Sequence, residues 1–224
     1  MEIVVNETTA VLPAALRTAL EAVSFPTIGH YLEEGFVEPG IRRQVATGGR
    51  VIGTAVTVRT TALDSTAVHH AAGMILPGQV LVIDTGGDRI HAPLGEVVAT
   101  QLKVRGAAGA VVDGVVTDLD ELEAIGLPVY ARGTSMLTTK HLKCGGGGIG
   151  VPVVCGGVGI LPGHVILGDR NGLLALEPSA LEAILDVALE DDASEPELLR
   201  QIENGGLLGE LSGATASIAE MQRA

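Results

Sequence analysis

Acidic residues follow two predicted strands in the middle of the chain, where they could bind a divalent cation. Asp84 ends the apolar run of residues 80–83, and Asp118 follows Val115-Val116-Thr117. Glu96 opens a predicted helix between them. Because ligands of open α/β sheets bind beyond the carboxyl ends of the strands, we expect these carboxylates to converge. Carboxylate oxygens and water are the ligands that Mg²⁺ and Mn²⁺ prefer.

The start of the helix after Gly95 offers a second chemical feature. The free backbone amides of residues 95–98 could bind a carboxylate or a phosphate group. A metal beside an anion pocket would suit an oxo-acid. The alternative is that the acidic residues are turn formers and helix caps without a ligand.

Other motifs predict no site. Residues 145–150 match GxGxxG by letter, but they precede a predicted strand instead of opening a helix, so we expect a loop. The sequence carries no P-loop, HExxH or GxSxG motif. His69 and His70 are neighbours on a predicted helix and face different directions, which indicates structural or surface roles. Cys144 and Cys155 are expected to be reduced thiols.

Short Val- and Ile-rich runs bounded by glycine or proline predict the strands that would position these residues. They cover residues 51–58, 80–84, 110–116, 129–131, 151–154, 165–167 and 173–176. Helices are predicted over residues 9–23, 65–74, 94–104, 119–125, 178–189 and 194–203, the last with Ser194 as its N-cap. The alternation of strands and helices in the middle predicts a parallel core, and the stretch 151–176 predicts antiparallel or mixed pairing.

Length and composition indicate one acidic globular domain. The 224 residues include 46% hydrophobic and only 2% aromatic residues, and the formal net charge is −13. Such a charge repels phosphate backbones and anionic lipids, so neither nucleic acid nor a membrane is an expected partner. The sequence shows no secretory signal or membrane-spanning run, which predicts a cytoplasmic protein.

The order of several blocks resembles the RraA-like family, which includes class II 4-hydroxy-4-methyl-2-oxoglutarate aldolases, oxaloacetate decarboxylases and the protein inhibitor of ribonuclease E. The matching blocks lie between about Gly49 and Pro178, and they include VIGTAVTV from Val51, PGQVLVID from Pro77, LGE from Leu94, GAAGAVVDG from Gly106, PVYARG from Pro128, LPGH from Leu161 and GDRNG from Gly168.

The resemblance implies an α/β fold: a single compact layered sandwich of the swivelling β/β/α type, with C-terminal helices. It implies a homotrimer or homohexamer whose site lies at a subunit interface. By position, Gly95, Glu96, Val97 and Val98 would bind the substrate carboxylate. Asp118 would hold Mg²⁺ or Mn²⁺. We expect an RraA-like domain over residues 1–190 and a helical extension over residues 191–224.

The chain departs from the family pattern at Thr117, where the aldolases carry a substrate-binding Arg. Replacing a guanidinium with a neutral hydroxyl costs about 1.5–3 kcal/mol, or roughly ten- to over a hundredfold in binding. Arg132 or Arg89 could supply the missing cation, although a surface ion pair is an equally good account of either. Glu121, three residues after Asp118, retains the family's acidic residue.

The resemblance therefore predicts a metal-dependent lyase that cleaves a small 2-oxo or 4-hydroxy-2-oxo acid by retro-aldol reaction or decarboxylation, through an enolate that the metal stabilises. Asp118, Thr117 and Glu96 are the expected catalytic residues, with Arg132 in substrate binding. Glu121 would assist Asp118 at the metal. Two alternatives remain: a non-catalytic binding protein of the ribonuclease-inhibitor type, or another metal-dependent reaction on a small organic acid.

Overall fold

The computed structural model describes residues 3–61, 63–143 and 146–223, and its centre is a mixed β-sheet. In the described part of the chain the sheet follows the order β1-β9-β3-β4-β5-β7-β2, with β12 and β13 added beside β3. The strands of this sheet are β1 (Val4–Val5), β2 (Arg42–Arg43), β3 (Val51–Arg59), β4 (Gln79–Asp84), β5 (Gly109–Asp113), β7 (Val129–Ala131), β9 (Gly148–Ile149), β12 (Val165–Gly168) and β13 (Leu173–Leu176).

The predicted parallel core is confirmed. Strands β3, β4, β5 and β7 pair in parallel, with Val56 opposite Leu81 and Leu81 opposite Ala110. The antiparallel character of the later strands is also confirmed, because β12 pairs antiparallel with both β3 and β13. Smaller pairs are formed by β6 (Val115–Val116) with β8 (Gly133–Thr134), and by β10 (Val153–Cys155) with β11 (Val158–Ile160).

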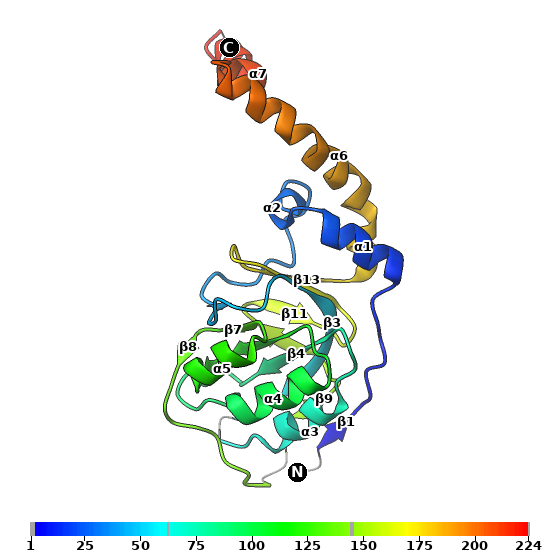
Figure 1. Cartoon of the computed structure of the whole chain (residues 1–224), viewed down its shortest axis with the longest axis vertical. Coiled ribbons are helices and arrows are strands. Elements are labelled where there is room, and N and C mark those ends of the chain that lie inside the picture. The colour runs from blue at the N-terminus through cyan, green and yellow to red at the C-terminus, as the bar shows by residue number, and fades with distance from the viewer. Residues whose placement is uncertain (1–2, 62, 144–145, 224) are drawn as a thin grey trace.

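Helices cover one face of the sheet, and the β10–β11 hairpin covers part of the other (Figure 1). The covering helices are α3 (Thr66–Met74), α4 (Glu96–Val104) and α5 (Leu119–Ile125). On β4, Leu81 and Ile83 pack under these helices, whereas Val80 and Val82 pack toward the hairpin side. Burial on both faces explains why this strand is continuously apolar. The layering agrees with the expected β/β/α sandwich.

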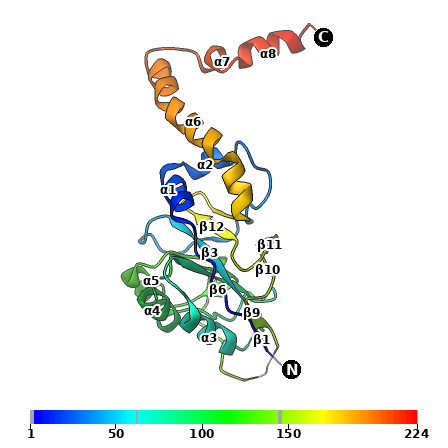
Figure 2. The same cartoon turned by 90° about the vertical axis from the view of Figure 1, so that its right-hand side faces the viewer.

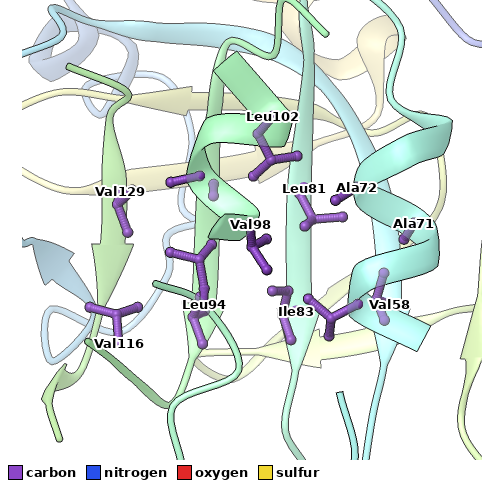
Figure 3. Close-up of a cluster of buried hydrophobic side chains, with 14 of the residues drawn as sticks. Val58, Ala71, Ala72, Leu81, Ile83, Leu94, Val98, Leu102, Val116 and Val129 are labelled. Atoms are coloured by element: carbon purple, nitrogen blue, oxygen red, sulfur yellow. The ribbon is translucent and has the colours of Figure 1, made fainter. Parts of the chain in front are cut away.

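Figure 3 shows the helix-side core. Leu94, Val98 and Leu102 on and before α4 meet Leu81 and Ile83 of the sheet. Because these side chains are fully or almost fully buried, the position of α4 over β4 and β5 is fixed by packing. That packing places the N terminus of α4 near the carboxyl ends of the strands.

The N-terminal helices and the first part of the long C-terminal helix pack against β12 and β13 of the sheet. These helices are α1 (Ala14–Ala22), α2 (Phe25–Ile28) and α6 (Pro178–Glu203), followed by α7 (Leu208–Leu211) and α8 (Ala214–Met221). The far part of α6 projects away from the sheet and carries α7 and α8 with it (Figures 1 and 2). None of the helices described has both the length and the apolar composition needed to cross a membrane.

Three predicted helix boundaries are wrong. The first helix begins at Ala14, not at residue 9, since Pro13 has an extended backbone and disfavours helix before it. The helices expected over residues 178–189 and 194–203 are one helix, α6, with Pro196 inside it. Ser194 does not cap a new helix, because its hydroxyl bonds to the Asp191 carbonyl of the preceding turn. Beyond α6, the expected helical extension contains two further helices, α7 and α8.

The glycine-rich stretch is not simply a loop. Gly148 and Ile149 form β9, which pairs with both β1 and β3, while Gly145 lies outside the described residues. Cys155 is a buried free thiol, as expected, and burial raises its pKa. Cys144 also lies outside the described residues.

Candidate functional site

The N termini of α4 and α5 are joined by hydrogen bonds through Asp118. Its Oδ2 atom accepts a bond from the Glu96 amide at 2.9 Å, and its Oδ1 atom accepts one from the Thr117 hydroxyl at 3.1 Å. The Thr117 amide donates to the Leu94 carbonyl at 3.1 Å. The residues predicted to carry the chemistry are therefore held next to one another.

Gly95 permits this approach because it has no side chain. A Cβ atom at position 95 would lie 2.3 Å from Asp118 Oδ2 and 2.7 Å from Thr117 Cγ2. Either distance is far below van der Waals contact, so any larger residue would displace the carboxylate or the helix.

Asp118 adopts the left-handed conformation, with φ of 59°, at the N-cap of α5. Its carbonyl accepts the Leu122 amide at 2.8 Å, which starts the helix. A non-glycine residue pays about 1–2 kcal/mol for this conformation. In this conformation the carboxylate accepts the Glu96 amide of α4, and residues in sparsely populated conformations cluster at functional sites.

A cavity of about 440 Å³ opens beside Asp118. Of the predicted site residues, Gly95, Val97, Val98, Thr117 and Asp118 line it. The opposite wall comes from segments that the sequence analysis did not connect with the site, and it includes Ser65, His69, Thr138, Thr139, Lys140 and His141.

Other predicted residues lie outside this cavity. The Glu96 and Glu121 side chains are exposed and do not line it, and the Glu96 amide is occupied by Asp118. Arg132 forms ion pairs with Asp113 and with Glu38.

Arg89 is exposed on the loop before α4 and does not line the cavity either. Neither arginine therefore supplies the positive charge that the family resemblance implies at position 117, where this chain carries a threonine. Among the residues that line the cavity, Lys140 is the lysine, and no arginine lines it.

Lys140 reaches the site because its loop is tied down on both sides. Its amide donates to Leu63 and its carbonyl accepts from Ser65, at 2.8 and 3.0 Å. The preceding residue, Thr139, donates its amide to the Ala92 carbonyl at 3.1 Å. A loop more than twenty residues beyond Asp118 is thus fixed against the start of α4.

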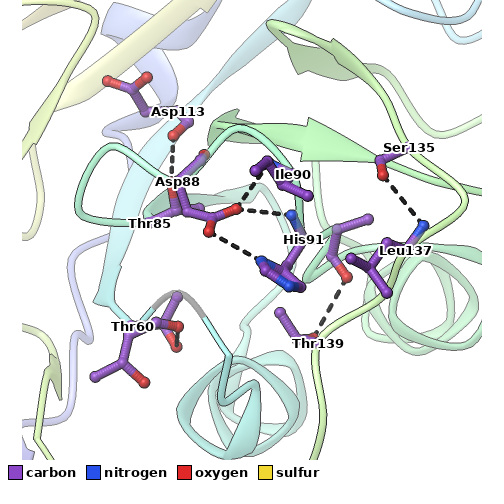
Figure 4. A network of polar contacts seen from close by, with 11 residues as sticks. Thr60, Thr85, Asp88, Ile90, His91, Asp113, Ser135, Leu137 and Thr139 are labelled. Atoms are coloured by element: carbon purple, nitrogen blue, oxygen red, sulfur yellow. Dashed lines mark hydrogen bonds and ion pairs between the residues drawn. The ribbon is translucent and has the colours of Figure 1, made fainter.

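The loop before α4 is itself rigidified by Asp88 (Figure 4). One Asp88 oxygen accepts the amides of Ile90 and His91 at 2.8 and 2.7 Å, and the other contacts the His91 ring at 2.9 Å. Burial alone would raise the pKa of Asp88, but the hydrogen bonds from His91 and Ile90 lower it below its ordinary value. Asp88 is therefore ionised at neutral pH and holds the loop that leads to Gly95.

Two histidines face each other on the cavity wall. The rings of His69 and His141 meet edge to face, with their centroids 4.1 Å apart. Burial, together with the neighbouring His141, lowers the pKa of His69 below 6.5. His69 is neutral near pH 7 and can accept a proton there.

The sequence analysis expected only structural or surface roles for His69 and His70, so it missed this residue of the cavity wall. It also missed Lys140 and His141. No spacing pattern connects position 69 with position 141, because only the tertiary structure brings helix α3 and the loop of His141 together.

The cavity can bind an anion. In the described part of the chain, the Val97 and Val98 amides at the start of α4 have no protein acceptor. These free amides form the positive end of the helix dipole, and the charge of Lys140 lies in the same cavity. A small carboxylate would meet two amide donors and an ammonium group here.

The oxygen donors at this place fit a hydrated Mg²⁺ or Mn²⁺ ion. Asp118 presents a carboxylate at the cavity, and each of its oxygens has a second acceptor position beyond its present hydrogen bond. The described residues contain no group of three or more His, Cys, Asp or Glu side chains that could hold a metal. Mg²⁺ typically keeps several waters and binds one or two carboxylates, so Asp118 would be one protein ligand of such an ion.

The chain is similar to several known proteins. The RraA-like (Aldolase/RraA) family model matches residues 25–175. A protein of Halalkalibacterium halodurans named "Putative 4-hydroxy-4-methyl-2-oxoglutarate aldolase" is 37% identical over 155 residues, which cover 69% of this chain and 73% of that protein.

Solved structures of related proteins are also similar. The RNA-processing inhibitor RraA of Thermus thermophilus is 28% identical, with a TM-score of 0.62, over 69% of this chain and 92% of its own. Streptomyces coelicolor RraAS2, described as an unusual member of the RNase ES inhibitor RraA family, is 26% identical, with a TM-score of 0.70. The match covers 85% of this chain and 97% of that chain. These likenesses to inhibitors of RNA processing give no support to the expected exclusion of nucleic-acid partners.

Proposed function

The chain belongs to the RraA-like family, and from that premise we propose that it is a lyase of the aldolase type that cleaves a small 2-oxo acid. One observation carries the proposal: a single cavity joins the Asp118 carboxylate, the Val97 and Val98 amides, and Lys140. These groups provide an acidic position for a cation and a basic position for a substrate carboxylate. The names of relatives such as the H. halodurans protein support an aldolase function.

In this proposal, the substrate carboxylate binds the Val97 and Val98 amides and Lys140. Lys140 takes over the charge that the family's Arg supplies, because Thr117 offers only a hydroxyl. Asp118 would hold Mg²⁺ or Mn²⁺, assisted by Glu121, which lies three residues later on α5. When bound, the cation would stabilise negative charge on the 2-oxo oxygen of the substrate.

Retro-aldol cleavage of a 4-hydroxy-2-oxo acid needs a proton acceptor. The C4 hydroxyl loses its proton, the C3–C4 bond breaks, and the bonding electrons pass to the C2 carbonyl, giving an enolate and a second carbonyl compound. His69 is placed on the cavity wall and is neutral near pH 7, so we assign it as the acceptor. A proton then returns to C3, which completes pyruvate.

The assay measures pyruvate with lactate dehydrogenase and NADH. Chelator-treated protein is supplied with MgCl₂ or MnCl₂ and with 4-hydroxy-4-methyl-2-oxoglutarate or oxaloacetate. Asp118→Asn removes the cation-binding charge while keeping the side-chain shape, and Asp120→Asn is the matched control in the same turn. Metal-dependent turnover that Asp118→Asn abolishes and Asp120→Asn retains would support the proposal.

A second candidate is a regulatory binding protein, which the likeness to the two RraA structures favours. It would need neither metal nor substrate. Absence of turnover together with absence of metal binding would favour this candidate. Absence of turnover with metal binding that depends on Asp118 would indicate a different reaction on a small organic acid.

We further propose that subunits assemble into trimers or hexamers, with this cavity at their interface. The exposed position of Asp118 and Val97 is consistent with a partner surface that closes the cavity. Light scattering of the purified protein would measure the assembly.

A further inference from the structure

A second cavity, of about 700 Å³, lies at the β2 edge of the sheet. Strand β2 forms one wall and the turn between β12 and β13 forms another. Arg42, Arg43 and Arg170 all line it. It shares no lining residue with the cavity beside Asp118, so it is a separate feature of the molecule.

The three arginines form no ion pair with any carboxylate in the described part of the chain. Arg42 Nε donates to the Pro39 carbonyl at 3.0 Å, and Arg43 Nε donates to the Val45 carbonyl at 2.8 Å. These bonds orient the guanidinium groups without neutralising them. In a chain with 27 acidic and 14 basic residues, three arginines that form no ion pair at one cavity are a distinctive surface feature.

The acidic residue within the cavity is already engaged. Asp169 accepts the Asn171 amide at 2.7 Å and the Asn171 side chain at 3.0 Å. Its carboxylate therefore caps its own turn, and the arginines retain donors for another partner.

The cavity has a rigid floor. Tyr130 is completely buried, lies opposite Arg43 in the β2–β7 pairing, and donates its hydroxyl to the Asp169 carbonyl at 2.8 Å. Burial raises the pKa of Tyr130 to about 12, an effect that the nearby Arg43 charge opposes. The floor is thus neutral and fixed. Three arginines against the one carboxylate of Asp169 leave the cavity lining with a net positive charge.

We propose that this cavity binds a small polyanion, carrying a phosphate group or several carboxylates. Guanidinium groups bind phosphate and carboxylate oxygens in pairs, and several of them favour a ligand with two or more negative charges. The cavity volume lies in the range of small-molecule sites, about 300–1,000 Å³. The site does not depend on the proposed lyase function.

Isothermal titration calorimetry tests the proposal with two probes, pyrophosphate and citrate, on chelator-treated protein without metal. The test variant is the double substitution Arg42→Gln with Arg170→Gln, which leaves the more embedded Arg43 in place. The matched control is Arg200→Gln with Arg223→Gln, because it removes the same charge from the C-terminal helices. Lys140→Gln controls for anion binding in the cavity beside Asp118.

We expect at least one probe to bind, and its dissociation constant to rise roughly ten- to hundredfold in the test variant. The control and Lys140→Gln should bind as the wild type does. Preference for pyrophosphate or citrate distinguishes a phosphate ligand from a polycarboxylate.

Three results would overturn the proposal. One is that neither probe binds, and another is equal weakening by the matched control, which would mean that only overall charge matters. The third is binding that is lost in Lys140→Gln. A change in oligomeric state in the test variant, without anion binding, would assign the arginines to contacts between copies of the chain. Because no turnover is measured, failure here leaves the lyase proposal untouched.

Discussion

The carboxylate of Asp118 accepts a hydrogen bond from the backbone amide of Glu96, with 2.9 Å between Oδ2 and the nitrogen. This contact joins the N termini of two helices that follow different strands. It also uses the first amide of α4, so a substrate anion would meet the next two amides, at Val97 and Val98. The same residue thereby shapes the anion pocket and presents its charge to the cavity.

Substitution of Gly95 should disturb this contact. In Gly95→Ala the new Cβ would lie 2.3 Å from Asp118 Oδ2, so the carboxylate must move. We expect turnover to fall about tenfold or more in the pyruvate assay. Gly73→Ala is the control, because a Cβ there has open space within α3, and it should stabilise the fold by about 0.5–1 kcal/mol. Full activity of Gly95→Ala would contradict the assigned geometry.

Loss of the Lys140 charge should weaken substrate binding. Lys140→Gln should raise KM about ten- to hundredfold with a smaller effect on kcat, because the ammonium contacts the unreacting carboxylate. Lys140→Arg should restore most of the affinity. Steady-state kinetics measure both, with Lys103→Gln as a control outside the cavity. An unchanged KM would remove Lys140 from the anion site.

Adding a cation at Thr117 should strengthen the anion half of the cavity. Thr117 is half-buried in the cavity wall, and Thr117→Arg places a guanidinium where the family resemblance implies a substrate-binding arginine. We expect KM for the 2-oxo acid to fall about tenfold. Thr117→Gln adds length without charge and should give no such gain. Equal KM values for the two variants would show that charge at this position is unimportant.

The free energy of unfolding should fall as the pH is lowered from about 7 to about 5. Burial lowers the pKa of His164 below 6.5, although Glu177 opposes the shift, and neither ring nitrogen has a hydrogen-bond partner among the described residues. As the pH falls through 6.5, His164 is therefore protonated at a higher pH in the unfolded chain than in the folded chain. Proton binding to the unfolded chain then favours unfolding. His164→Asn should flatten this dependence in denaturant titrations, and the exposed His70→Asn should not. Parallel curves for wild type and His164→Asn would refute this account.

The far end of the C-terminal helices should contribute little to stability. No residue of α7 or α8 is buried, so deleting residues 205–224 should change Tm by less than about 2 °C. Asp192 on α6 instead accepts bonds from the Ser24 amide and the Thr27 hydroxyl. Asp192→Ala should lower Tm by several degrees, whereas the exposed Asp186→Ala should not. We accordingly propose that the body extends to about Asp192, close to the boundary expected at residue 190. A large Tm loss on deletion would contradict this.

The sequence by itself determined the parallel core and the position of Asp118 beside Gly95. Strands buried on both faces must be continuously apolar, so runs such as residues 80–83 are recognisable without a structure. The carboxyl ends of parallel strands share one edge of a sheet, which brings residues 95 and 118 together from local pattern alone. The family resemblance was carried by these strand segments and the glycine-containing turns that follow them, because turns that need glycine tolerate few substitutions.

Only the tertiary structure decided the rest of the site. His69 lies on α3, and backbone bonds from Thr139 and Lys140 to other loops place the segment of Lys140 and His141 beside it. No periodicity in the sequence records such contacts. Arg132 was a reasonable candidate cation from its place after a strand, but Asp113 and Glu38 neutralise it. The continuity of α6 through Pro196 also depends on context, because an interior proline removes one backbone hydrogen bond and locally disfavours a helix. Local sequence sets the strands and turns, whereas the pairing of charges depends on which loops the fold brings into contact.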